Sequence, residues 1–141
     1  MILAFLLWFS TAFGSDWGRY EAEIVRIKDA DTLIVEAVTF PDPKETKQLN
    51  IRVFGIDTPE KGHRGKCDLE RRKAMEAKQL ATELLHNAEA LIVYFGGARV
   101  RDGFGRYLMR VEADGVDLGE YLIDQGYAYT YYGQTKRSWC N

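Results

Sequence analysis

Residues 50–60 of this 141-residue chain combine one cation and two carboxylates in a short span. An apolar, β-branched run carries Arg52 and ends at Asp57, and Glu60 follows three residues later. Pro59 lacks an N–H group and favours an extended conformation in the preceding residue, so we expect the strand to leave its sheet here. These groups could hold a phosphate beside a divalent metal ion. They could equally form an ordinary strand with a charged, solvated end.

Two other charged positions lie next to turn-forming sequences. Asp29-Ala30-Asp31 separates two β-rich runs, which together predict a hairpin with Asp31 at the mouth of its second strand. The glycine-containing segment 102–105 precedes Arg106 and an alternating run over residues 106–112, which predicts another strand. We therefore expect both charged residues at the ends of strands.

The elements that must position these residues follow from the apolar pattern. The third strand is expected over residues 48–56. A helix is expected to follow it, with Asp68 as its N-cap and Asn87 as a left-handed cap at its C-terminal end. A strand over 90–95 follows, and Asp117 and Glu120 have the spacing of a capping box for a short second helix. Five strands with a helix between the third and fourth predict an α+β, mainly β fold, a five-stranded OB-fold barrel with a C-terminal helix.

The composition limits the class of protein. The length suffices for one domain with a real core, and residues 15–141 are expected to form it. A formal net charge of -2 argues against a protein that coats nucleic acid by bulk charge. It does not exclude a nuclease, because acidic metal ligands offset local basic residues. Loop 41–44, with two prolines, is expected to be exposed.

The N-terminus and the cysteines indicate an exported protein. Residues 2–9 are continuously apolar, and residues 12–14 have the small-x-small pattern of a signal peptidase cleavage site. Residues 1–14 are therefore expected to be a signal peptide. A buried strand or an uncleaved membrane anchor is the alternative. In an exported chain, Cys67 and Cys140 would form a disulfide, although two free thiols stay possible. Two cysteines and two histidines far apart in the sequence do not make a zinc site.

Three motifs together resemble the staphylococcal nuclease (thermonuclease) family. They are Asp29-x-Asp31-Thr32, Arg52-x-x-x-x-Asp57-Thr58-Pro59-Glu60 and Asp102-Gly103-Phe104-Gly105-Arg106, in the family's order. The resemblance covers roughly residues 20–132. One departure is that Gly103-Phe104 stands where the type member has a lysine and a tyrosine, although Phe104 could still stack on a base.

The resemblance implies a calcium-dependent nuclease, with endonuclease and exonuclease action on DNA and RNA that leaves 3′-phosphate ends. Asp31, Asp57 and the carbonyl of Thr58 match the calcium ligands. Arg52 and Arg106 match the family's arginines that bind the scissile phosphate. Glu60 matches the carboxylate beside the attacking water, which acts either as a general base or as a group that positions the water. We expect a secreted or periplasmic monomer without stable membrane association after processing.

Alternatives stay open for several residues and for the activity itself. The basic group His63, Arg64, Lys66, Arg71, Arg72 and Lys73 could contact a DNA backbone or form a solvated face. The C-terminal tyrosines, residues 127–132, are expected to pack rather than stack on bases. A catalytically inactive nucleic-acid- or protein-binding module on the same fold is the second hypothesis for function.

Overall fold

The computed structural model describes residues 18–38 and 46–141. The expected signal peptide, its cleavage site and the exposed loop 41–44 lie outside these ranges. The elements, in chain order, are β1 (Arg19–Asp29), β2 (Thr32–Val38), β3 (Thr46–Val53), β4 (Ile56–Asp57), a 3-10 turn η1 (Gly62–Arg64), α1 (Asp68–His86), β5 (Leu91–Phe95), β6 (Tyr107–Ala113), β7 (Val116–Asp117), α2 (Leu118–Asp124) and β8 (Tyr129–Thr130).

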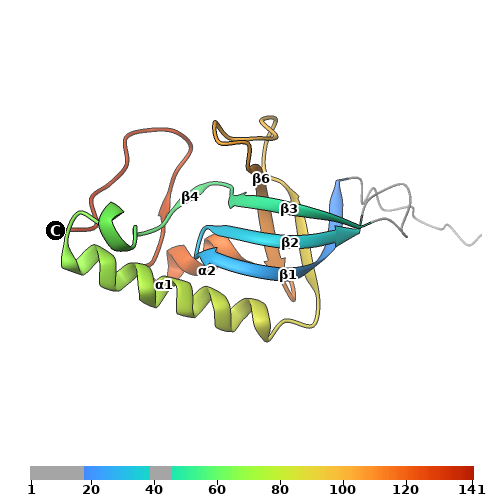
Figure 1. The fold of residues 1–141 in the computed structure, drawn as a ribbon, viewed down its shortest axis with the longest axis horizontal. Helices are drawn as coiled ribbons and strands as arrows, with labels where there is room; N and C mark the ends of the chain where they lie inside the picture. The colour runs from blue at the N-terminus through green and yellow to red at the C-terminus, as the bar shows by residue number, and fades with distance from the viewer. Residues whose placement is uncertain (1–17, 39–45) are drawn as a thin grey trace, which may run out of the picture.

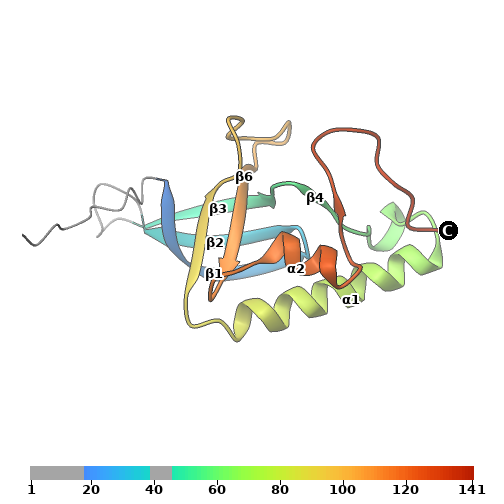
Figure 2. The same cartoon turned by 180° about the vertical axis from the view of Figure 1, so that it is seen from behind.

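Five strands close into a mixed barrel. The order β3-β2-β1-β5-β6 is antiparallel throughout, and β6 then pairs with β3 in parallel to complete the ring (Figure 1). The helix α1 follows the third strand and α2 comes after the barrel strands. The predicted OB-fold barrel and its α+β class are confirmed. Helix α1 runs along one side of the barrel against β1, and α2 packs beside it against β6 (Figure 2).

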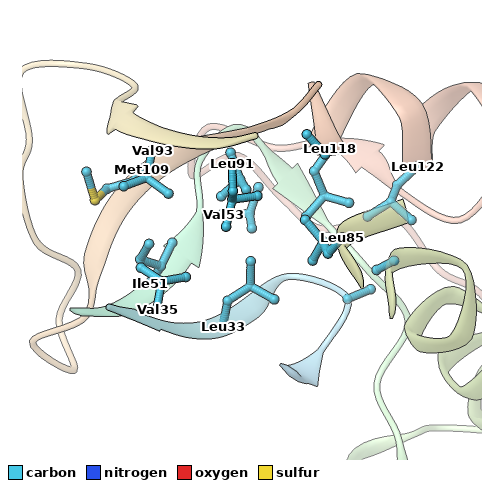
Figure 3. Close-up of a cluster of buried hydrophobic side chains, with 14 of the residues drawn as sticks. Leu33, Val35, Ile51, Val53, Leu85, Leu91, Val93, Met109, Leu118 and Leu122 are labelled. Carbon is cyan, nitrogen blue, oxygen red and sulfur yellow. The ribbon is translucent and has the colours of Figure 1, made fainter. Parts of the chain in front are cut away.

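Strand alternation places the apolar side chains inside the barrel. Ile51 and Val53 of β3 are 0% and 2% exposed, and Met109 of β6 is fully buried between them and the neighbouring strands (Figure 3). Leu85 of α1 and Leu118 of α2 cap this core from the helical side. Because side chains alternate along a strand, the residue between Ile51 and Val53 faces outward. That residue is Arg52.

Both ends of α1 differ from the prediction. The N-cap is Cys67, whose Sγ accepts a hydrogen bond from the Glu70 N–H at 3.4 Å, and not Asp68. Asp68 is the first helical residue and pairs with Arg71 at 2.6 Å. Asn87 is right-handed, with φ -84° and ψ -8°, because its N–H continues the helical bonding, so the left-handed cap was also wrong. At α2 the predicted N-cap is present: the Asp117 carboxylate accepts from the Glu120 N–H at 2.9 Å.

The third strand stops earlier than predicted. It ends at Val53, and Gly55 has φ +84°, a left-handed conformation that glycine adopts without steric cost. The chain turns there and continues as β4, which leaves the barrel and pairs with β8. The prediction of one strand up to Ile56 is therefore wrong. This turn carries Asp57 away from the barrel edge and into contact with the C-terminal tail.

The disulfide between Cys67 and Cys140 is confirmed, with the two Cα atoms 5.9 Å apart. It joins the start of α1 to the tail, which forms a wide loop beside β4 (Figure 1). Helices in the described ranges are too short or too polar to cross a membrane.

Candidate active site

Arg52 joins two carboxylates that come from different parts of the chain. Its cross-strand partner is Thr32, so the β2–β3 register places the guanidinium beside Asp31 in the preceding turn. Arg52 Nη1 lies 3.3 Å from Asp31 Oδ2, and Nη2 lies 3.9 Å from Asp57 Oδ1. Both carboxylates are buried, at 8% and 5% residue exposure. The structure thus brings together three of the predicted site residues.

Asp57 has a second cationic neighbour that the sequence did not predict. Lys136 Nζ lies 2.9 Å from Asp57 Oδ1, although this buried oxygen accepts no well-aligned hydrogen bond from the described residues. Burial lowers the pKa of Lys136, but the Asp57 carboxylate outweighs it, so the net pKa is raised. The β4–β8 pairing and the Cys67–Cys140 disulfide hold the tail that carries Lys136 beside Asp57. No local sequence pattern could have identified it.

Arg106 reaches the same corner from the loop before β6. Its Nη1 donates to Thr32 Oγ1 at 3.3 Å, and the Thr32 hydroxyl donates to Asp31 Oδ1 at 3.1 Å. A continuous hydrogen-bonded chain therefore connects Arg106 to Asp31, which also contacts Arg52. The two predicted arginines flank one buried carboxylate.

Asp102 holds Arg106 in place. Its Oδ1 accepts the backbone N–H groups of Phe104 and Arg106, each at 2.9 Å, and its Oδ2 accepts from Arg106 Nε at 2.7 Å. Burial raises the pKa of Asp102, but these hydrogen bonds and the Arg106 charge outweigh it and lower the pKa overall. The motif containing Asp102 was visible in the sequence, but its role as a positioning residue was not. Phe104 is 88% exposed beside Arg106, whose guanidinium carbon lies 5.5 Å from the ring centre.

Glu60 lies on the loop that leaves this corner. Its backbone N–H donates to Glu70 Oε2 at 3.3 Å, and its own carboxylate lies 3.5 Å from Arg64 Nε. Burial raises the pKa of Glu60, the Arg64 charge opposes this, and the charge of Asp31 adds to the rise. Glu60 is therefore within electrostatic range of Asp31, and its carboxylate is a stronger base than an ordinary glutamate.

The basic group before α1 contributes partly to the protein's own structure. Arg64 also lies 3.7 Å from Asp29, and Arg71 donates to the Gly65 carbonyl at 2.7 Å. These two cations help to hold the loop that carries Glu60.

Several of the C-terminal tyrosines pack, as expected. Tyr129 stacks on Trp139 with ring centres 4.0 Å apart, and Tyr127 donates to Glu76 at 2.8 Å. Tyr132, in contrast, is 61% exposed and contacts Phe54 at 5.5 Å between ring centres.

The donor set suits a hard, loosely held cation. Residues 18–38 and 46–141 contain no cluster of three or more His, Cys, Asp or Glu side chains arranged for a metal ion. Asp31 and Asp57, which both contact Arg52, and the adjacent Thr58, at 3% exposure, could provide oxygen ligands. Calcium accepts such ligands and completes its shell with water or substrate oxygens.

Comparison with known proteins identifies a family. A family model described as "Staphylococcal nuclease homologue" matches residues 50–139. The matched range includes Arg52, Asp57, Thr58, Glu60 and Arg106, whereas Asp31 precedes it. An uncharacterized protein of Methanocaldococcus jannaschii is 27% identical over 139 aligned positions, which cover 86% of this chain and 64% of that protein. The chain thus spans less than two thirds of the length of this relative.

Proposed function

The chain belongs to the staphylococcal nuclease family, and we propose on this basis that it is a calcium-dependent nuclease. Its substrates would be DNA and RNA, cleaved by endonuclease and exonuclease action at phosphodiester bonds to leave 3′-phosphate ends. The observation that carries this proposal is the flanking of buried Asp31 by two arginines, Arg52 directly and Arg106 through Thr32.

The two arginines would bind the scissile phosphate. A guanidinium fork matches two phosphate oxygens, and two forks from different elements can stabilise the charge that develops as the phosphorus becomes five-coordinate. Arg106 is prepared for this because Asp102 fixes its Nε and leaves Nη1 directed at Thr32.

Asp31, Asp57 and the Thr58 carbonyl would hold the calcium ion. A bound calcium ion would offset the phosphodiester charge that repels an incoming nucleophile. The burial of both carboxylates and of Thr58, with the two carboxylates on either side of Arg52, supports this assignment.

Glu60 would act on the attacking water. Its raised pKa makes it a better proton acceptor than an ordinary glutamate, while leaving it able to orient a water molecule through its oxygens. A general base contributes about 10²–10⁴-fold to the rate.

A binding module without activity is the second hypothesis. Such a module would be expected to lose charged site residues, whereas this chain keeps Asp31, Arg52, Asp57, Glu60 and Arg106. Four of them converge through the contacts described above, which favours the enzyme.

Cleavage of plasmid DNA and of a labelled RNA tests the proposal, in calcium, in magnesium and with a calcium chelator. We expect turnover in calcium, little in magnesium because the site is sparse and flexible rather than octahedral, and none with chelator. A shift in product mobility after treatment with a 3′-phosphatase would identify the ends. Equal rates in magnesium would contradict the calcium assignment, and binding without cleavage would favour the module.

The cellular setting is also proposed. The Cys67–Cys140 disulfide is typical of oxidising compartments. We propose that residues 1–14 are removed on export and that residues 15–141 act as a monomeric nuclease domain without stable membrane association. N-terminal sequencing of exported protein tests the cleavage site, and retention of residues 1–14 would contradict it.

A further inference from the structure

A cavity of about 170 Å³ opens at one end of the barrel, and the proposed nuclease site does not use it. Its apolar wall includes three aromatic rings, from Tyr20 of β1, Phe95 of β5 and Tyr107 of β6. Phe95 and Tyr107 lie against each other with ring centres 6.2 Å apart. Aromatic walls of this kind accept nucleobases regardless of sequence, because every base has a π-face.

Two cations meet at the mouth of this cavity. Lys47 Nζ lies 3.1 Å from the Tyr107 hydroxyl oxygen, and Arg101 Nη2 lies 2.5 Å from the same atom. The Arg101 guanidinium also lies 4.2 Å from the centre of the Tyr107 ring. Within the described ranges neither cation has a carboxylate partner. The hydrogen bond from Lys47 lowers the pKa of Tyr107, burial opposes it, and the charge of Arg101 adds to the lowering.

This arrangement is suited to an anion. Two like charges held at one oxygen repel each other, and a bound phosphate would convert that repulsion into two charge-assisted hydrogen bonds. The phenol hydroxyl adds a third polar group. A nucleic-acid strand offers both a phosphate for the cations and a base for the aromatic wall.

We propose that Lys47, Arg101 and Tyr107 form a second phosphate site, which binds the substrate strand away from the position of cleavage. This inference rests on the proposed nuclease function and names a binding site for the same substrate. A base of the strand would lie against the aromatic wall of the cavity.

The chain connects this second site directly to the first. Arg101 and Asp102 are neighbours in one loop, and they hold Tyr107 and Arg106 respectively. This loop projects from the barrel at the start of β6 (Figure 1). Lys47 precedes Arg52 by five residues on β3, so the two sites are at least roughly 16 Å apart, and because side chains alternate along a strand, the two cations leave opposite faces of β3. That distance corresponds to a few nucleotides, so a dinucleotide could not occupy both sites.

Oligonucleotide length therefore provides the test. Fluorescence anisotropy, without calcium so that nothing is cleaved, would measure the affinity of a fluorescein-labelled octathymidylate and of the corresponding dinucleotide. The variants are Lys47→Met with Arg101→Gln, and Arg26→Gln with Lys78→Met as the matched control. Arg26 of β1 and Lys78 of α1 have no ion pair in the described ranges and line neither site, and their removal changes the net charge by the same amount. Urea melts would establish that all proteins are folded.

We expect the double variant to bind the octamer about tenfold or more weakly, because charge-assisted contacts to a phosphate are lost. The slope of log affinity against log salt should fall by about 0.7, the contribution of one phosphate in a single strand. Dinucleotide affinity should change by less than about twofold, as should both affinities of the control variant with Arg26→Gln and Lys78→Met.

An unchanged octamer affinity in the folded double variant would overturn the second site and leave the nuclease proposal intact. An equal loss of affinity for the dinucleotide would also overturn the second site. The charges of Lys47 and Arg101 would then act on the first site or through the overall electrostatic field of the protein. Failure of the wild-type protein to cleave the octamer once calcium is added would overturn the nuclease proposal, and the second site with it.

Discussion

Lys136 is expected to compete with calcium for Asp57, so Lys136→Met should bind calcium more tightly than the wild-type protein. The ammonium group lies 2.9 Å from the same buried oxygen that we assign to the metal. A divalent cation must separate this ion pair and then tolerate a positive charge nearby. Methionine keeps the length and apolar stem of lysine and removes only the charge.

The size of the effect follows from the surroundings of the pair. Unit charges about 4 Å apart interact by about 1 kcal/mol in water and about 4 kcal/mol near a protein surface. The Lys136 side chain is 50% exposed, which favours the lower value, whereas the Asp57 side chain is only 6% exposed. Solvent screening limits exposed pairs to about 1 kcal/mol or less, so a half-buried pair should contribute about 1–2 kcal/mol. Calcium should therefore bind about 5- to 30-fold more tightly to Lys136→Met.

Isothermal titration of calcium into the protein at 0.15 M salt, roughly physiological ionic strength, measures this directly and needs no substrate. Arg137→Met is the matched control, because Arg137 is a cation of the same tail that contacts the Tyr129 ring at 4.2 Å instead of a carboxylate. Its calcium affinity should stay within about twofold of wild type. Equal affinities for Lys136→Met and wild type would refute the competition, and weaker binding would mean that Lys136 supports the site's geometry.

The other predictions concern the catalytic corner and the covalent bridge. Arg106→Lys keeps the charge but loses the fork, so single-turnover cleavage should slow by about 10²-fold or more with little change in the urea midpoint; near-normal cleavage would reject its role. Glu60→Gln should slow cleavage by about 10²–10⁴-fold. Burial raises the pKa of Glu60 in the folded protein, so above the unfolded-state pKa the ionised carboxylate disfavours folding. Glu60→Gln should therefore be no less stable than the wild-type protein at pH 7. A large loss of stability at that pH would contradict a raised pKa. The pKa of Asp102 is lowered in the folded protein, so its carboxylate stabilises the fold above the unfolded-state pKa of about 3.9. This contribution is lost as the pH falls through the folded-state pKa. Asp102→Asn should therefore cost about 1–3 kcal/mol at neutral pH, and urea melts across pH should show the difference shrinking in acid; a constant difference would exclude the charge as its cause. Cys140→Ser opens a bridge between residues 73 apart and should destabilise the fold by up to about 4 kcal/mol; alkylation of both thiols in unreduced wild-type protein would rule the bridge out.

The barrel and half of the site could be predicted because their determinants are local. The turn after Asp29 and the alternation along residues 32–35 and 48–53 place Asp31 directly before β2 and Arg52 on the strand that pairs with β2, and their charged groups lie 3.3 Å apart. The N-cap of α2 depends on two residues three apart and was also predictable.

The remainder depends on contacts between distant segments. The turn at Gly55 is defined by the pairing of β4 with β8, and a side-chain atom added there would lie 3.2 Å from Tyr132. Cys67 replaces Asp68 as the N-cap at the residue where the tail is attached. Lys136 reaches Asp57 from the segment between the β8 pairing and the disulfide. No window of sequence contains the information for such an arrangement.

The β4–β8 pairing and the Cys67–Cys140 bridge together make a closed ring from two segments that are remote in the chain. One arc runs from Asp57 to Cys67 and carries Glu60, and the other returns along the exposed tail through Lys136. A single protease cut in the tail would therefore release no fragment while the bridge is intact. The nicked protein would have almost the mass of the whole chain, yet Lys136 would no longer be held at Asp57 from both sides. Integrity judged on a non-reducing gel would conceal this change, and only reduction would separate the pieces.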